Sequence, residues 1–282
     1  MKIKPINNSP ALWLSNFPWK KKNDHKYSRG KLIVIGGQIN MTGATILSAE
    51  AALRVGVGSV KIICSKKTLP IYSSKFPSSL KEVINNLSSL KKLIIKEKNS
   101  VFLIGPGAGV NQLTKERTKL ILKNSKYAII DADALTCFKA KPIELYRLLD
   151  KNKIITPHIK EFHTIFPSIN KKISNYEKII KASRLCKCTI VLKGTNTLIC
   201  SQLGKVVINK HASSELAVIG SGDVLSGIIS SLVGKNKLNP FLSSCAGVWI
   251  HGDIAKKFGL GLIAEDIIKN IPKTLRKLKK TN

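Results

Sequence analysis

The fold is decided by residues 101–135, VFLIGPGAGVNQLTKERTKLILKNSKYAIIDADAL. An apolar run at 101–104 is followed by a glycine-rich loop, a helical pattern over 114–123 and a second apolar run at 128–130. Both runs are short and continuously apolar, which is typical of strands buried on both faces of a parallel sheet. The stretch therefore predicts a strand, a crossover helix and a second, parallel strand.

The same alternation continues on both sides of this stretch. Further strand candidates are residues 32–35, 60–64, 154–155 and 189–192, and further helical patterns cover 44–55, 143–149 and 175–185. Apolar runs at 197–200 and 206–208 flank a polar turn and predict a late β-hairpin, after which helical segments follow at 223–233, 241–258 and 264–278. This order predicts a three-layer α/β/α fold around a mostly parallel sheet. We expect a single domain over 1–282, with an N-terminal extension over 1–24.

The composition excludes several classes of protein. With 282 residues, of which 43% are hydrophobic and 23% charged, the chain is typical of a globular protein and not of a disordered or collagen-like one. No apolar run reaches the length of about 18 residues that a transmembrane helix needs, and no apolar segment follows the N-terminus as in a secretory signal. The six cysteines form no C-x-x-C pair, so we expect free thiols in the reducing cytoplasm.

The charge is the one unusual feature of the composition. Lysine and arginine number 48 against 16 acidic residues, which gives a net charge of +32. Only six of the 48 are arginine, and the lysines are spread over the whole chain. Proteins that recognise nucleic-acid sequence favour arginine, because its guanidinium group binds bases through two hydrogen bonds. We therefore attribute the lysines to codon composition and expect no nucleic-acid partner.

Two glycine-rich loops follow predicted strands, at residues 36–44 and 105–109. Neither matches the G-x-G-x-x-G dinucleotide motif or a Walker A loop. Their glycines either allow a ligand to approach the backbone or serve tight turns, and the sequence leaves both interpretations open.

Polar side chains follow three other predicted strands. Asp131 and Asp133 either bind a metal or a polar substrate, or Asp133 caps the next helix. His158 lies on a loop at a strand end, and Glu161 either caps a helix or contacts Mg²⁺ through water. Lys193 precedes Gly and hydroxyl residues, which suits phosphate binding, although an exposed lysine is the simpler interpretation.

The most specific motif is Gly220-Ser221-Gly222-Asp223, at the start of an apolar helix. Backbone N–H groups at a helix start stabilise negative charge, so this loop predicts an anion hole for a transferred phosphoryl group. Asp223 at its rim is placed to accept a proton from an attacking hydroxyl. Helix capping would explain Asp223 but not the adjacent Gly-Ser-Gly, so we favour the functional interpretation.

Together these motifs resemble the ribokinase-like superfamily, whose glycine-rich anion-hole loop ends in G-x-G-D, and more narrowly the nucleotide-dependent NAD(P)H-hydrate dehydratases. The resemblance extends from about residue 8 to residue 275 and rests on motifs at 25–30, 36–44, 51–58, 105–107, 131–135, 156–161, 192–194, 220–225 and 251–252. It implies metabolite repair by phosphoryl transfer from ADP or ATP to the ring hydroxyl of hydrated NADH or NADPH, with loss of phosphate. The family often forms homo-oligomers. Because the chain starts almost at the dehydratase motifs, we expect no epimerase domain in it.

The resemblance also implies a role for each candidate residue. Asp223 would be the base. The residues group by role as follows: Gly220, Ser221 and Gly222 would form the anion hole; Lys193, Gly194, Thr195, Asn196, Thr197 and Gly222 would bind the nucleotide; Ala44, Gly107, His158 and Asp223 would bind the hydrated dinucleotide. Mg²⁺ would bridge the phosphates, with Glu161 as a candidate contact through water.

Two other functions stay open at this point. A ribokinase-like kinase for a small alcohol, such as a vitamin precursor, would share residues 220–223 but would not require the motifs at 105–107 and 156–158. A nucleic-acid binder would use the net charge and would bind with a steep dependence on salt.

Overall fold

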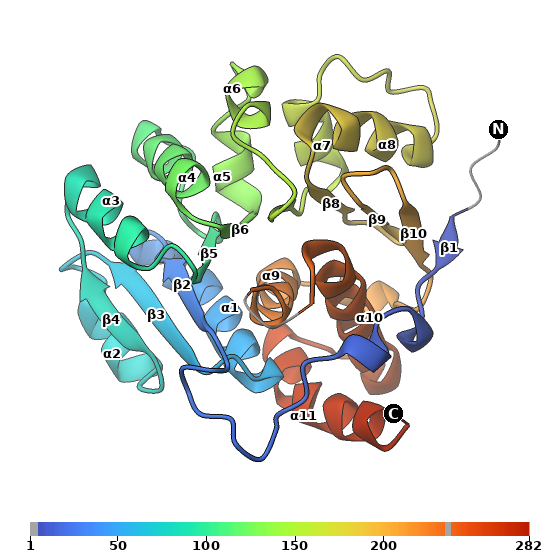
Figure 1. Cartoon of the computed structure of the whole chain (residues 1–282), viewed down its shortest axis with the longest axis horizontal. Helices are drawn as coiled ribbons and strands as arrows, with labels where there is room; N and C mark the ends of the chain where they lie inside the picture. The colour runs from blue at the N-terminus through green and yellow to red at the C-terminus, as the bar shows by residue number, and fades with distance from the viewer. Residues whose placement is uncertain (1–4, 235–237, 282) are drawn as a thin grey trace.

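The computed structural model describes residues 5–234 and 238–281. Residues 1–4 of the expected N-terminal extension lie outside this range. The described residues form one ten-stranded sheet with the order β1-β10-β9-β8-β7-β6-β5-β2-β3-β4 (Figure 1). Its strands are β1 (Ile6–Asn7), β2 (Lys31–Ile35), β3 (Ser59–Cys64), β4 (Leu80–Val83), β5 (Val101–Ile104), β6 (Tyr127–Ile130), β7 (Lys153–Ile155), β8 (Thr189–Leu192), β9 (Thr197–Cys200) and β10 (Val206–Asn209). Of these ten strands, only β9 runs antiparallel to both of its neighbours, β8 and β10. The mostly parallel sheet and the late hairpin are therefore confirmed.

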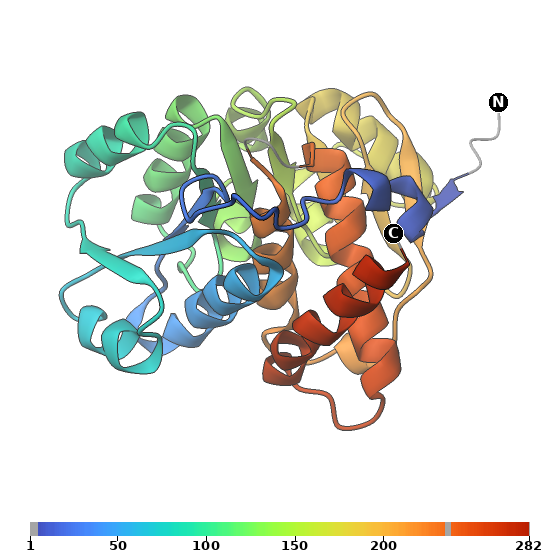
Figure 2. The same ribbon diagram turned by 60° about the horizontal axis from the view of Figure 1, so that its bottom comes forward.

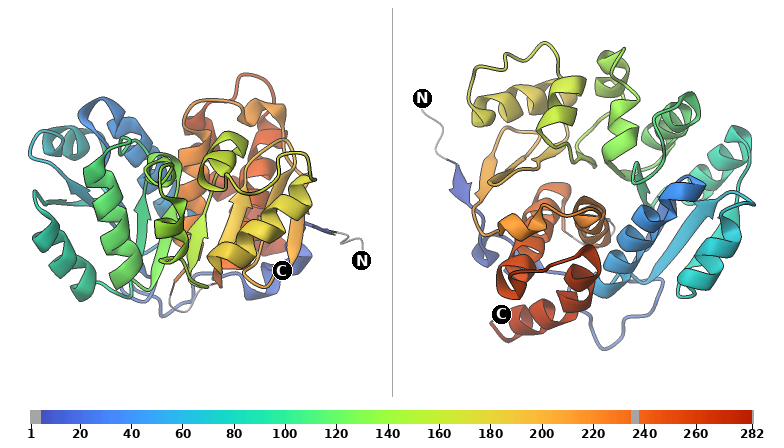
Figure 3. Two further views of the ribbon diagram at one scale, coloured as in Figure 1. Left: turned by 90° about the horizontal axis from the view of Figure 1, so that it is seen from above. Right: turned by 180° about the vertical axis from the view of Figure 1, so that it is seen from behind.

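Helices cover both faces of the sheet and complete the predicted three layers (Figure 3). One face carries α1 (Thr42–Val55), α2 (Leu69–Lys75), α9 (Ser221–Leu232), α10 (Pro240–Phe258) and α11 (Ala264–Lys280). The other carries α3 (Leu87–Lys96), α4 (Gln112–Asn124), α5 (Ala132–Thr136), α6 (Pro142–Tyr146), α7 (Ile159–Ile165) and α8 (Asn175–Cys186).

The central strands are continuously apolar because alternate side chains enter different cores. In β5, Val101 and Leu103 belong to the core under α1, α9 and α10, whereas Phe102 and Ile104 belong to the core under α3, α4 and α5. All four side chains are buried. A strand with helices on both faces has no solvent side, so it needs apolar residues at every position.

The N-terminal segment is packed against the body of the protein. Its strand β1 extends the sheet by pairing in parallel with β10, and the chain then runs beside α10 (Figure 2). Trp13 is fully buried and packs against Trp249 of α10. The Asn8 side-chain amide donates to Asn209 and to the backbone oxygen of Cys245. The described part of the extension therefore contributes to the sheet and to the core.

Several sequence-based boundaries are wrong, and some elements were not predicted. The helix expected over 223–233 begins two residues earlier, at Ser221, and the one expected over 143–149 covers only Pro142–Tyr146. The sequence also did not predict β1, β4, α2, α3, α5 or α7. Among the described residues, no helix has both the length and the apolar character that crossing a membrane requires.

Candidate functional site

The loops singled out in the sequence meet at the carboxyl ends of the parallel strands. The first glycine loop contacts the second, because the Gln38 N–H donates to the Gly107 oxygen at 2.8 Å. The loops after β7 and β8 are joined by the Lys193 N–H, which donates to the Pro157 oxygen at 2.9 Å. Helix α1 reaches α9 through the Ser48 hydroxyl, which donates to the Asp223 backbone oxygen at 3.0 Å. The fold thus brings together residues that are up to 175 positions apart in the chain.

Gly220 is the N-cap residue of α9 and lies in the left-handed region, with φ of +84°. This conformation favours glycine, and a Cβ atom here would also lie 2.5 Å from the end of the Leu47 side chain and 3.0 Å from the Ala264 Cβ, so these side chains would have to move. The Ser221 N–H donates to the Val218 oxygen at 3.3 Å and is thus used within the loop. The following N–H groups, of residues 222 and 223, have no acceptor within the described part of the chain. These two are the donors that the loop offers to an anion.

A buried histidine supports the start of α9. His251 of α10 has its Nε2 atom 3.0 Å from the Ser221 oxygen and 3.1 Å from the Ser221 hydroxyl. Burial lowers the pKa of His251 to about 4, so the imidazole is neutral near pH 7. Its motif was noticed in the sequence, but its contact with the anion-hole loop was not predicted.

Asp223 lies in the first turn of α9, two residues inside the helix, and its side chain caps nothing. The capping interpretation is therefore wrong. Its carboxylate forms no hydrogen bond with any described residue and is partly exposed. Burial, then the charge of Asp131, raises the pKa of Asp223 to about 6, although Lys193 acts in the opposite direction. A carboxylate without a partner and with a pKa close to neutrality is suited to accept a proton.

Lys193 is held inside the site, which excludes the interpretation of an exposed lysine. Its Nζ atom is 2.8 Å from the Asp131 carboxylate, and its side chain is 19% exposed. An added Cβ on Gly222 would lie 3.6 Å from this nitrogen, so the ammonium faces the start of α9. Burial alone would lower the pKa of Lys193, but the carboxylates of Asp131, Glu161 and Asp223 raise it. The ammonium is therefore charged at neutral pH.

The turn after Lys193 is open to solvent. Gly194, Thr195 and Asn196 are exposed between β8 and β9. The Thr197 hydroxyl closes the turn by donating to the Gly194 oxygen at 3.1 Å. The turn thus offers backbone and side-chain polar groups beside the buried ammonium.

Asp131, and not Asp133, caps the helix that follows them. The buried Asp131 side chain accepts a hydrogen bond from the Ala132 N–H at 2.9 Å. Asp133 instead accepts from the Gly109 N–H at 2.8 Å and so fixes the second glycine loop. The prediction that Asp133 caps the helix is therefore wrong.

His158 and Glu161 form a reciprocal cap at the start of α7. The His158 Nδ1 atom accepts from the N–H groups of Lys160 and Glu161 at 3.1 and 3.2 Å. The Glu161 carboxylate accepts from the His158 N–H at 2.8 Å, which confirms its capping role. The His158 side chain is half exposed, and its Nε2 atom lies 3.4 Å from the Glu161 carboxylate. Burial raises the pKa of Glu161.

Ala44 and Gly107 lie together at the first glycine loop. Gly107 has φ of +65°, and its added Cβ would lie 2.5 Å from the Met41 oxygen and 3.4 Å from the Ala44 Cβ. Ala44 is partly exposed, while Gly107 is buried. The two residues are thus close enough to contact one ligand.

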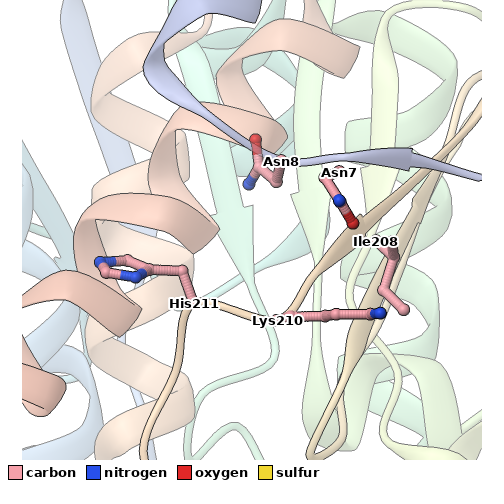
Figure 4. A pocket seen from close by; sticks show the side chains of 5 residues that line it. All are labelled: Asn7, Asn8, Ile208, Lys210 and His211. Carbon is pink, nitrogen blue, oxygen red and sulfur yellow. The ribbon is translucent and has the colours of Figure 1, made fainter.

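Two cavities lie away from this group of loops. One of about 270 Å³ lies between the N-terminal strand and the end of β10; Figure 4 shows its lining residues, Asn7, Asn8, Ile208, Lys210 and His211. Another of about 530 Å³ lies between α10 and α11, beside Trp249 and Leu278. Neither is lined by a predicted site residue, so the candidate site rests on the meeting of the loops.

The sequence is similar to the sequences of known proteins. A family model described as NAD(P)H-hydrate dehydratase matches residues 32–273. The ADP-dependent (S)-NAD(P)H-hydrate dehydratase of Neisseria meningitidis is 31% identical over 264 residues, which cover 89% of this chain and 86% of that protein. A bifunctional NAD(P)H-hydrate repair enzyme of Dictyoglomus turgidum is 32% identical over 271 residues, and the chain spans about half of its length, 51%.

The fold has close counterparts among solved structures. The ADP/ATP-dependent NAD(P)H-hydrate dehydratase of Bacillus subtilis, co-crystallised with ATP and Mg²⁺, superposes with a TM-score of 0.82. The match covers 98% of this chain and 99% of that chain at 22% sequence identity. At this identity the likeness establishes the shared fold alone.

Proposed function

The chain belongs to the NAD(P)H-hydrate dehydratase family, and we propose that it restores NADH or NADPH from their hydrates in a nucleotide-dependent reaction. The hydrated ring carries a hydroxyl group on a saturated carbon, and hydroxide is a poor leaving group. Phosphorylation by ADP or ATP converts this hydroxyl into a phosphate ester. The C–O bond to the phosphate then breaks, a neighbouring ring proton is lost, and the double bond returns. Catalysis therefore needs a base, an anion hole and two substrate sites.

The observation that carries this proposal is the unpartnered carboxylate of Asp223 beside two free backbone N–H groups. Asp223 would take the proton from the ring hydroxyl while the oxygen of that hydroxyl attacks the terminal phosphorus of the nucleotide. Gly220 and Ser221 would shape the anion hole, and the N–H groups of Gly222 and Asp223 would stabilise the charge on the transferred phosphoryl group. Because these donors are fixed at a helix start, they need no rearrangement during the reaction.

The two substrates would approach this point from different loops. The nucleotide would bind along Lys193, Gly194, Thr195, Asn196, Thr197 and Gly222. Its phosphates would meet the Lys193 ammonium, which faces Gly222. The hydrated dinucleotide would bind on the other side, at Ala44, Gly107 and His158. Support for this side comes from the close approach of the two glycine loops and from the half-exposed side chain of His158.

The residues present also fit Mg²⁺ carried by the nucleotide. The ion pair of Lys193 is with Asp131, and the carboxylates of Glu161 and Asp223 also act on the charge of this ammonium, so the site holds carboxylates beyond the one that pairs with the lysine. Over the described ranges, no group of three or more His, Cys, Asp or Glu side chains is placed to hold a metal alone. Mg²⁺ is commonly bound through one or two carboxylates, water and substrate phosphates. Glu161 would hold it through water, and the bound ion would supply positive charge to the phosphates.

The test is an absorbance assay on acid-hydrated NADH with Mg²⁺ and either ADP or ATP. We expect the reduced-nicotinamide band to rise only when a nucleotide is present, and the faster nucleotide identifies the phosphoryl donor. AMP, which has no phosphoanhydride bond, is the matched control. A folded sample that gives no rise with either nucleotide would contradict the proposal. A stable phosphorylated product from a small alcohol would then indicate the kinase.

A further inference from the structure

We propose that Asp131 is a positioning residue that holds the Lys193 ammonium at the start of α9 and away from Asp223. The base, the anion hole and the two substrate sites proposed for this protein do not use the Asp131-Ala132-Asp133 motif. The inference rests on the proposed function for its meaning, because Lys193 is the ammonium that meets the nucleotide phosphates. The contacts of Asp131 are nevertheless independent of which reaction the site performs.

The Asp131 carboxylate joins three elements of the fold. It lies at the end of β6 and is 1% exposed. One oxygen accepts from Lys193 Nζ, at the end of β8, at 2.8 Å, and from the Ala132 N–H at 2.9 Å. The other accepts from the hydroxyl of Ser226, three residues after Asp223 in α9, at 2.5 Å. The carboxylate thus forms an ion pair with the lysine and, through a separate oxygen, contacts the helix that carries Asp223.

The backbone around Asp131 is shaped to keep it in place. Ala132 has φ of +45°, a left-handed conformation that costs a non-glycine residue on the order of 1 kcal/mol or more. A Cβ on Gly105 would lie 1.8 Å from the backbone oxygen of Asp131, so the end of the neighbouring strand approaches the Asp131 backbone too closely for any side chain at residue 105. Strain of this kind persists only where the surrounding contacts determine the conformation. Here it orients a single buried carboxylate.

Asp131 determines which carboxylate the Lys193 ammonium pairs with. A lysine side chain has four rotatable bonds and can choose among nearby carboxylates. Within the described residues, its ion pair is with Asp131, although Glu161 and Asp223 also act on its charge. Without Asp131, the ammonium is free to pair with Asp223, which would occupy the base and displace the cation from the phosphate position. Asp131 keeps the cation and the base apart.

The test is a double-mutant cycle on nucleotide binding with Asp131→Asn, Lys193→Met and the double variant. The dissociation constants of ADP and ATP, each with Mg²⁺, are measured by calorimetry. We expect each single variant to weaken binding by about tenfold or more, the range for hydrogen bonds to charged groups. The double variant should bind within about twofold of Lys193→Met, because Asp131 acts through Lys193. Losses that multiply in the double variant would overturn the proposal.

Ser226→Ala is the matched control, because it removes another hydrogen bond of the same carboxylate and leaves the ion pair. It should bind nucleotide within about twofold of wild type. An equal loss in this variant would show that Asp131 acts through α9 and would overturn the role assigned to Lys193. If Asp131→Asn does not fold, Asp131→Ser takes its place in the cycle with the same expectation, because serine can still cap the helix through its hydroxyl but carries no charge.

The binding measurement separates this proposal from the proposed function. A wild-type protein that binds nucleotide but does not restore hydrated NADH would refute the dehydratase activity, while the cycle would still decide the role of Asp131. A wild-type protein that binds neither nucleotide would overturn both.

Discussion

Replacing Asp223 by asparagine should lower the turnover of the protein while raising its stability. The amide cannot accept the hydroxyl proton, so turnover should fall by roughly 10²–10⁴-fold, the range for loss of a general base. Nucleotide affinity should not fall, because the free N–H groups of α9 and the Lys193 ammonium are unchanged. A carboxylate close to the phosphates repels them, so its neutralisation removes an unfavourable interaction.

The same substitution should stabilise the fold above pH 6. The pKa of Asp223 is raised from 3.8 to about 6, so the fold disfavours the charged carboxylate that wild type carries at neutral pH. A rise of this size corresponds to roughly 3 kcal/mol at most. Between pH 3.8 and 6 the folded state binds more protons than the unfolded state, so wild type loses this stability as the pH rises. The asparagine variant escapes the loss and should gain about 1–3 kcal/mol at pH 8 and almost nothing at pH 4.

The assay combines turnover of hydrated NADH with urea unfolding at pH 8 and pH 4. In wild type, kcat/KM should fall below about pH 6 as the base becomes protonated. The exposed Glu265→Gln exchange is the matched control and should change neither turnover nor stability. Near-normal turnover in Asp223→Asn would refute its role as the base. A variant less stable than wild type at pH 8 would refute the electrostatic reasoning.

Two further predictions concern the framework of the site. Gly227→Ala places a Cβ 2.1 Å from the backbone oxygen of Ser48, where α1 and α9 pack together, and should lower the free energy of unfolding in urea by about 1–3 kcal/mol or more. Gly43→Ala is the matched control and should not lower it, because an added Cβ there meets no described atom within 4 Å. Burial lowers the pKa of His251 from 6.5 to about 4, so wild type should lose stability as the pH falls through this interval. The free energy of unfolding of His251→Gln should fall less than that of wild type when both are measured from pH 7 to pH 4. Equal slopes in wild type and His251→Gln would contradict the buried, neutral imidazole.

The sequence predicts the central strands because burial on both faces leaves a continuous apolar pattern. The elements that it misses lack that pattern for physical reasons. Strand β4 lies at the sheet edge, where Leu80 is exposed and charged residues follow it, and β1 has only two residues. Helices α5 and α7 are short and are set by the caps of Asp131 and His158, not by apolar periodicity. Local hydrogen bonds of this kind are not visible in a hydrophobic pattern.

The residues proposed for the site can be picked out from the sequence, whereas the contacts between them cannot. The glycines of the anion-hole loop and Asp223 follow from a local pattern, because a helix start and its glycines lie within a few residues. The partner of Lys193 does not, since Asp131 is 62 residues away in the chain. Their contact depends on β6, β7 and β8 being consecutive in the sheet. A sequence places each residue at a strand end, but the choice among several nearby carboxylates requires the three-dimensional arrangement.

The charge of the site is opposite in sign to that of the chain, and this contrast explains how a base and an anion hole can share one place. The chain carries +32, yet the loops bring the carboxylates of Asp131, Glu161 and Asp223 to a single ammonium. A second lysine beside Asp223 would attract the phosphates but would also lower the pKa of the base and pair with it. Backbone N–H groups stabilise an anion with partial charges that neither titrate nor form an ion pair. On the proposed function, the start of α9 would therefore bind the anion and Lys193, in its ion pair with Asp131, would carry the full positive charge, so that Asp223 would be left free to accept a proton.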